Sequence, residues 1–254
     1  MLTRKLNIAL LLAGGEGTRA KQNVPKQYVQ IEGIPILAYT LRAFDRHPLI
    51  DAVYVVCQDR WRDYIHRFTS ELSFNKFAGT FPAGSTSFES IRSGIQGLSQ
   101  IYGVKAIETI DTIDSIDTIS SSPSHIVLVH DGVRPLVSAD IISDSIRVCQ
   151  LRGNAIAAVQ TEEAYMAGDA EKATGMIPRE QRWGAQTPHT FYLQDLVAAF
   201  HEADEKGIQT SQSLYTLMAE LQHWPLYKSR GERVNLKITN PEDIWFFSRL
   251  ASVL

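Results

Sequence analysis

Residues 8–19 run Ile-Ala-Leu-Leu-Leu-Ala-Gly-Gly-Glu-Gly-Thr-Arg, an apolar segment that ends directly in glycines. Apolar residues without polar alternation predict a strand that is buried on both faces, as in a parallel sheet. Glycines directly after such a strand let the backbone pass close to a phosphate chain, and free N–H groups there can bind it. The segment therefore predicts an α/β fold with an anion site after its first strand.

The same pattern continues along the chain, where short apolar runs alternate with amphipathic segments. The predicted strands are Ile8–Ala13, Ala52–Cys57, Phe77–Phe81, Ile126–Val129, Ala155–Val159 and Val234–Ile238. The predicted helices are Ile36–His47, Phe88–Ile101, Leu193–Ala203 and Pro241–Leu254, the last with proline at a tolerated first-turn position. This alternation predicts a Rossmann-like, mostly parallel sheet with helices on both faces.

We expect a single domain over residues 1–254, because no second boundary is evident. Residues 107–119 repeat a three-residue unit that suits neither strand nor helix, so we expect a disordered surface insertion at about 107–124. Weak helical patterning from Gln160 to Pro188 indicates an arm or hairpin, at about 160–185, that leaves the sheet.

Composition excludes several classes of protein. The 254 residues are 44% hydrophobic and 21% charged, which is ordinary for a globular enzyme and excludes wholesale disorder. A net charge of −3 argues against a nucleic-acid partner. The two cysteines lie in apolar surroundings, as buried thiols do in a reducing compartment. The apolar run at residues 8–13 is short for a secretory signal and no other run approaches a membrane span, so we expect a cytoplasmic protein with no membrane partner.

Two cations follow the glycines, Arg19 and Lys26, and would add positive charge to the anion site. Ala20 stands where a dinucleotide fingerprint needs its third glycine, and no Gly-Lys-Ser/Thr of a Walker loop follows. A nicotinamide-dependent oxidoreductase also needs an acidic residue at the end of the second strand, and Asp59 lies too far on. The plain alternative is a glycine-rich turn with two solvated charges.

Four groups of residues, in order, resemble those of one family. They are Ala13-Gly14-Gly15-x-Gly17-x-Arg19 with Pro25-Lys26-Gln27-Tyr28, then Val129–Pro135, then Gln186–Phe191, then Asn235–Asp243. The first is similar to the sugar-nucleotidyltransferase signature. Together they resemble the alditol-phosphate cytidylyltransferases, which comprise the 2-C-methyl-D-erythritol 4-phosphate and the ribitol-5-phosphate cytidylyltransferases.

The resemblance implies a reaction and its cofactor. An acceptor phosphate attacks the α-phosphorus of CTP and releases pyrophosphate, with Mg²⁺ as cofactor; positioning and cationic stabilisation supply most of the catalysis. Arg19 and Lys26 would bind the triphosphate and stabilise the developing charge. The resemblance assigns backbone contacts with the nucleotide to Ala13, Gly14 and Gly15.

The segment at residues 83–90 resembles the loop of this family that recognises the base. Gly84 and Ser85 would recognise the cytosine edge through backbone groups, and Ser90 would add a hydroxyl. The plain alternative is a helix cap at Ser87, where the family usually has arginine. The serine in place of this arginine changes the part of the nucleotide pocket on which the preference for CTP depends.

Four residues match acceptor-side positions of the family. Asp131 would lie near Mg²⁺ and the acceptor, with an Asx turn as the plain alternative. Arg134 would contact an anion or form a structural ion pair with Asp131. Thr187 and Lys237 would meet the acceptor phosphate, Lys237 as a catalytic group; a lysine on a solvated strand face is the alternative.

These motifs leave open which phosphate compound accepts the CMP group. The methylerythritol enzymes usually have Thr and Arg on the arm, where this chain has Glu163 and Met166, and Gly132-Val133 replaces a pair of alanines. A glutamate suits polyol hydroxyls better than a phosphate dianion. We therefore expect ribitol 5-phosphate or a similar polyol phosphate. Methylerythritol phosphate is the alternative, and another phosphate or phosphonate comes third.

The resemblance also implies a homodimer whose arms are exchanged between subunits. The apolar arm residues Met166, Met176, Ile177 and Trp183 would then pack on a partner, whereas the competing reading buries them in the core of their own chain. A nucleotide-binding regulatory protein without catalysis is the alternative from another class. Retention of Arg19, Lys26, Asp131 and Lys237 together argues against it.

Overall fold

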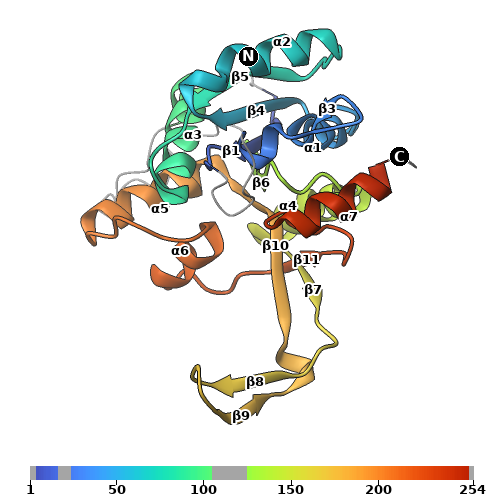
Figure 1. The fold of residues 1–254 in the computed structure, drawn as a ribbon. Helices are drawn as coiled ribbons and strands as arrows, with labels where there is room; N and C mark the ends of the chain where they lie inside the picture. The colour runs from blue at the N-terminus through green and yellow to red at the C-terminus, as the bar shows by residue number, and fades with distance from the viewer. Residues whose placement is uncertain (1–3, 17–23, 105–124, 252–254) are drawn as a thin grey trace, which may run out of the picture.

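The computed structural model describes residues 4–16, 24–104 and 125–251 (Figure 1). Its strands are β1 (Asn7–Ala13), β2 (Gln30–Ile31), β3 (Ile34–Pro35), β4 (Ala52–Cys57), β5 (Phe77–Pro82), β6 (Ile126–Asp131), β7 (Asn154–Gln160), β8 (Tyr165–Gly168), β9 (Ala173–Ile177), β10 (Trp183–Tyr192) and β11 (Lys228–Arg230). Its α-helices are α1 (Ile36–Asp45), α2 (Arg62–Glu71), α3 (Ser87–Tyr102), α4 (Ala139–Arg152), α5 (Leu193–Glu205), α6 (Leu214–Glu220) and α7 (Pro241–Ala251), and short 3-10 turns are η2 (Lys26–Tyr28), η3 (Asp59–Trp61) and η4 (Arg179–Gln181).

The central sheet has seven strands in the order β11-β7-β10-β6-β1-β4-β5. Neighbouring strands run parallel except at β10, which is antiparallel to both β6 and β7. In the register of the middle strands, Ala13 pairs with Cys57 and Leu12 pairs with Asp131. The glycines after β1 and Asp131 at the end of β6 therefore lie at the same edge of the sheet, where open α/β sheets place their sites.

Alternate residues of the buried strands pack against helices on opposite faces of the sheet (Figure 1). On one face, Ala9 and Leu11 join a core with side chains of α1, α2 and α4. On the other face, Ile8 and Leu10 join a core with side chains of α3, α5 and α6. The predicted α/β fold, a mostly parallel sheet covered on both faces, is confirmed.

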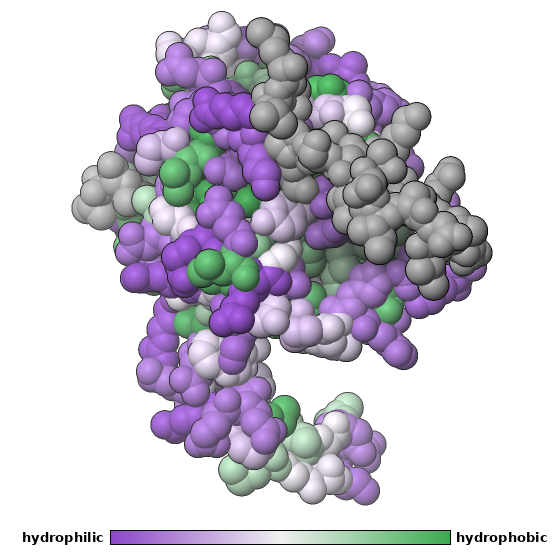
Figure 2. Space-filling model, turned by 180° about the vertical axis from the view of Figure 1, so that it is seen from behind, coloured by the Kyte–Doolittle hydropathy of each residue, from purple (hydrophilic) through white to green (hydrophobic). Residues whose placement is uncertain are grey.

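An arm extends from the far ends of β7 and β10 and carries the β8–β9 hairpin (Figure 1). From behind, the arm forms a hook below the body, with hydrophobic side chains on the hairpin (Figure 2). Met166 and Met176 pair across the hairpin and are 77% and 71% exposed. The reading that buries these side chains in the core of their own chain is therefore wrong.

One sequence expectation needs correction, and another falls outside the described residues. Val234–Ile238 forms no strand: its amides and carbonyls bond to loops, as in the 2.9 Å bond from the Ile238 N–H to the Val133 carbonyl. Strands β10 and β11 complete the sheet instead. The expected insertion at 107–124 lies outside the described residues. Within the described ranges, no helix is long and apolar enough to cross a membrane.

Candidate active site

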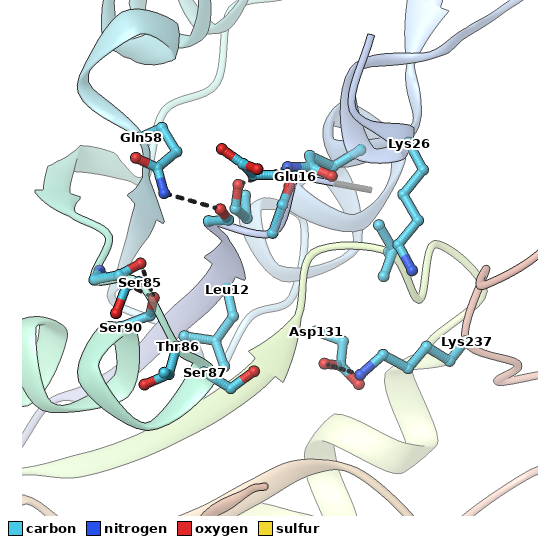
Figure 3. Close-up of a pocket in the computed structure, with 16 residues that line it drawn as sticks. Leu12, Glu16, Lys26, Gln58, Ser85, Thr86, Ser87, Ser90, Asp131 and Lys237 are labelled. Atoms are coloured by element: carbon cyan, nitrogen blue, oxygen red, sulfur yellow. Dashed lines mark hydrogen bonds and ion pairs between the residues drawn. The ribbon is translucent and has the colours of Figure 1, made fainter. Parts of the chain in front are cut away.

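A pocket of about 590 Å³ opens at the carboxyl ends of β1, β4 and β6 (Figure 3). It brings together nine of the residues singled out from the sequence: Ala13, Gly14, Gly15, Lys26, Gly84, Ser85, Ser90, Asp131 and Lys237. In Figure 3 the serines at the start of α3 lie on one side of the pocket, and Lys26, Asp131 and Lys237 lie on the other. Segments that are distant in the sequence thus form one polar cavity.

Gly14 and Gly15 line the pocket for different reasons. A Cβ on Gly14 would lie 2.5 Å from the Ala83 Cβ, so only glycine lets the end of β1 pack against the loop before α3. A Cβ on Gly15 would meet nothing within 4 Å and would project into open space. The backbone at Gly15 is thus accessible to a ligand, as a phosphate-binding turn requires.

Three side chains that we did not select from the sequence fix this glycine turn. The buried Gln27 amide donates to the carbonyls of Ala13, at 2.8 Å, and Gly15, at 2.7 Å. Tyr28 donates to the Ala13 carbonyl at 3.3 Å and Gln58 to the Gly14 carbonyl at 3.2 Å. These hydrogen bonds to the backbone carbonyls hold the turn in one conformation. Gln27 and Tyr28 were visible in the Pro-Lys-Gln-Tyr motif, but only the fold shows what they contact.

Asp131 is the centre of the opposite side of the pocket. Its Oδ1 accepts a 2.9 Å bond from the Lys237 ammonium, and its Oδ2 accepts a 2.9 Å bond from the Arg134 Nε. Burial alone would raise the pKa of Asp131, but Lys237 and Arg134 hold the pKa well below its ordinary value. Asp131 is therefore a carboxylate at neutral pH. Its side chain makes these ion pairs rather than an Asx turn, and Lys237 is not merely a solvated surface cation.

Arg134 forms the structural ion pair with Asp131, which was one of the two alternatives that the sequence left open. Besides Asp131, its Nη1 donates to the Asn235 carbonyl at 2.7 Å, and its side chain is 11% exposed. Arg134 does not line the pocket. Its geometry is that of a positioning residue, which orients Asp131 and anchors the segment that carries Lys237.

Thr187 and Asn235 connect this cluster to β10. The Thr187 hydroxyl oxygen accepts from the Asp131 N–H at 3.1 Å, and Asn235 donates to the Thr187 carbonyl at 3.0 Å. Asn235 is fully buried and also bonds to Gln186. Asn235 and Gln186 stand within two of the motifs, but the sequence alone predicted no role for them. They fix the loop before Lys237, which explains why this segment is not a strand.

Two buried histidines stand beside Asp131. His130 precedes it on β6, and His189 pairs with Val129 from the neighbouring strand β10. Burial lowers the pKa of His130 to about 3 and the pKa of His189 to about 4. Both imidazoles are neutral at pH 7, so they add no positive charge to the cluster.

One predicted site residue is not described, and another lies elsewhere. Arg19 falls outside the described residues. Glu163 lines a second cavity of about 540 Å³ at the base of the arm, with Glu162, Tyr165 and Arg233. Within one chain, Glu163 is therefore not brought to the main pocket.

The start of α3 differs from the cap we considered. Thr86, not Ser87, is the N-cap residue, and it forms a reciprocal capping box with Glu89. The N–H of Gly84 donates to the Ser90 hydroxyl at 3.1 Å. The loop that would contact the base is thus held by the first turn of the helix behind it.

The residues present fit a magnesium ion that arrives with a nucleotide. Among the described residues, no group of three His, Cys, Asp or Glu side chains could hold a metal. Mg²⁺ commonly takes only one or two protein carboxylates, with substrate phosphates and water as its other ligands. Asp131 is ionised, lines the pocket and has lone pairs beyond its three bonds, so it is a suitable single ligand.

Comparison with known proteins agrees with this architecture. A family model described as 2-C-methyl-D-erythritol 4-phosphate cytidylyltransferase matches residues 7–248. A ribitol-5-phosphate cytidylyltransferase of Lacticaseibacillus paracasei is 35% identical over 94% of this chain and 95% of its own length. A 2-C-methyl-D-erythritol 4-phosphate cytidylyltransferase of Clostridium acetobutylicum is 30% identical over 94% and 95%. A solved 4-diphosphocytidyl-2C-methyl-D-erythritol synthase of Anaerococcus prevotii shares the fold, with TM-score 0.75 and 20% identity over 98% of this chain and 99% of that one.

The fold and these relatives define a nucleotidyltransferase. The chain belongs to the 2-C-methyl-D-erythritol 4-phosphate cytidylyltransferase family, as the resemblance of its motifs predicted.

Proposed function

We propose that this enzyme transfers CMP from CTP to ribitol 5-phosphate, giving CDP-ribitol and pyrophosphate. One observation carries the proposal: a single pocket joins a glycine turn and Lys26 to the cluster of Asp131 and Lys237. The first group suits a triphosphate, and the second suits the phosphate of an acceptor. Transfer between two phosphates needs both of them within one cavity.

The chain's own residues position the reactants. An oxygen of the acceptor phosphate attacks the α-phosphorus of CTP, the bond to the β-phosphate oxygen breaks, and pyrophosphate leaves. Lys26 extends into the pocket and would stabilise negative charge on the transferred phosphoryl group (Figure 3). Lys237 would orient the acceptor phosphate while keeping its bond to Asp131. Arg19 keeps its predicted role at the triphosphate.

Mg²⁺ belongs to this proposal as the expected cofactor. Asp131 would be its ligand from the protein, and the phosphates of CTP would supply others. When bound, the ion neutralises phosphate charge.

Two observations support ribitol 5-phosphate as the acceptor. The L. paracasei relative, at 35% identity, carries that name, and the C. acetobutylicum relative, named for methylerythritol phosphate, is 30% identical. Glu162 and Glu163 place carboxylates at the base of the arm, and carboxylates accept hydrogen bonds from polyol hydroxyls.

The arm supports a homodimer. An isolated two-stranded hairpin is marginally stable, and every residue of β9 is exposed in one chain. Packing the hairpin on a second copy would cover Met166 and Met176 and carry Glu163 to a partner's pocket. We also propose a cytoplasmic location, which the unpaired thiols of Cys57 and Cys149 favour.

Product analysis tests the function. The enzyme is incubated with CTP, Mg²⁺ and either ribitol 5-phosphate or 2-C-methyl-D-erythritol 4-phosphate, and both pyrophosphate and the CDP-alditol are measured. We expect equimolar products and a higher kcat/KM with ribitol 5-phosphate. Preference for methylerythritol phosphate would reassign the acceptor. CTP binding without turnover of either acceptor would contradict the proposed reaction.

A further inference from the structure

We propose that Glu89 determines the preference for cytosine by accepting both hydrogen-bond donors of Ser85, so that Ser85 offers only acceptor lone pairs to the base. This inference rests on the proposed function, because it assigns the base of the nucleotide to that part of the pocket. Glu89 is a positioning residue, because it does not itself line the cavity.

One carboxylate oxygen accepts from three donors of the loop 84–86. Glu89 Oε2 accepts from the Ser85 N–H at 2.7 Å, from the Ser85 hydroxyl at 2.5 Å and from the Thr86 N–H at 3.2 Å. The remaining backbone donor of the loop, the Gly84 N–H, bonds to the Ser90 hydroxyl. The three backbone N–H groups and the Ser85 hydroxyl therefore all point toward α3.

A hydroxyl ordinarily recognises either a donor or an acceptor, because its hydrogen can rotate. Here the Ser85 hydrogen is directed at a charged acceptor, which makes a stronger bond than a neutral group offers. Hydrogen bonds from Ser85 hold the pKa of Glu89 below its ordinary value, so the carboxylate stays charged at neutral pH. The Ser85 oxygen thus faces a ligand as an acceptor.

This polarity separates cytosine from uracil. Cytosine carries an exocyclic 4-amino group, a donor, where uracil carries a carbonyl oxygen, an acceptor. An acceptor on Ser85 pairs with the amino group and is left opposite a second acceptor when UTP binds. Two acceptors that face each other with no hydrogen between them are disfavoured, so UTP binds more weakly.

The steric surroundings keep Glu89 close to the loop. A Cβ on Gly84 would lie 2.2 Å from the Glu89 Cβ, so the backbone of the loop passes directly over this side chain. Glycine at position 84 therefore allows the contact on which the polarity of Ser85 depends.

The test compares CTP with UTP. The ratio of their kcat/KM values is measured with the same acceptor for the full chain and for the variants Glu89→Gln, Ser85→Ala and Ser213→Ala. In Glu89→Gln the side-chain amide can donate to Ser85, so we expect the ratio of CTP to UTP to fall about tenfold. Ser85→Ala removes the acceptor itself and should lower the ratio similarly.

Ser213→Ala is the control because it breaks the capping box at the start of α6, which does not line the pocket. It should lower the melting temperature without changing the ratio. An unchanged ratio in both Glu89→Gln and Ser85→Ala overturns the inference, as does an equal fall in Ser213→Ala. Failure of the unaltered enzyme to use any nucleotide would instead contradict the proposed function.

Discussion

At the scale of single residues, Gly14 and Gly15 show how neighbouring glycines serve different ends. Gly14 has no room for a methyl group beside Ala83, whereas the space around Gly15 is open. The first is therefore required by packing and the second is available to the ligand. The motif predicted a phosphate-binding turn, but it did not distinguish these two roles.

Replacing each glycine by alanine should separate the roles. Gly14→Ala forces the end of β1 away from Ala83 and should lower the free energy of unfolding by about 1–3 kcal/mol. Gly15→Ala should change stability by less than about 0.5 kcal/mol. Its methyl group should instead raise the KM for CTP about tenfold, because it occupies pocket space. Denaturant unfolding and steady-state kinetics measure both; equal stability of the two variants would contradict this account.

The sequence predicted most pocket residues because they come directly after strands or within contiguous motifs. It offered Arg134 as a partner of Asp131, but it could not predict Lys237 and Thr187 as partners, since they reach Asp131 from distant segments. Gln58 was missed for a related reason, since it acts on the backbone of another loop and nothing in its local sequence signals that contact. Glu89 stands three residues after Thr86, the spacing of a capping box, but we considered the cap at Ser87 instead.

At the scale of elements, buried strands were predicted with nearly correct bounds, and Ala52–Cys57 agrees at both ends. Among the strands, the failures are segments whose partners are distant. Val234–Ile238 alternates like a strand, yet buried bonds of Asn235 hold it as a loop. Strand β10 carries polar residues and a proline, so no periodicity identified it.

The arm makes a prediction at this scale. The double variant Met166→Lys, Met176→Lys places two charges on the face that we expect a partner to cover. The sedimenting mass should halve and activity should fall, because Glu163 would no longer reach the second subunit.

A matched control is Ile101→Lys with Leu151→Lys, which changes two exposed residues on α3 and α4. The control should remain a dimer. Retention of the dimer by the arm variant would contradict arm exchange.

At the scale of the whole molecule, the buried histidines link stability to pH. His130 and His189 titrate in the folded protein near pKa 3 and 4, against 6.5 when exposed. Below about pH 6.5 the unfolded chain therefore binds more protons, so the free energy of unfolding falls as the pH falls. The pKa of Asp131 is also lowered, so the free energy of unfolding falls further when this carboxylate is protonated at more acid pH.

Denaturant unfolding between pH 6 and 4.5 should show a slope of up to about 2.7 kcal/mol per pH unit from these two histidines. His47 and His125, whose pKa values are lowered by burial, add to it. In His189→Gln the slope should decrease by about 1.4 kcal/mol per pH unit. A slope unchanged by this substitution would show that His189 is not buried and neutral.

The central claim is that one pocket holds two phosphates, with Lys26 serving CTP and Lys237 serving the acceptor. Two-substrate kinetics of Lys26→Ala and Lys237→Ala tests it most directly. We predict that Lys237→Ala lowers kcat/KM for ribitol 5-phosphate about 100-fold and changes the KM for CTP less than twofold, while Lys26→Ala lowers kcat by about 100-fold or more. Loss of CTP affinity in Lys237→Ala, or full turnover in Lys26→Ala, would contradict the account.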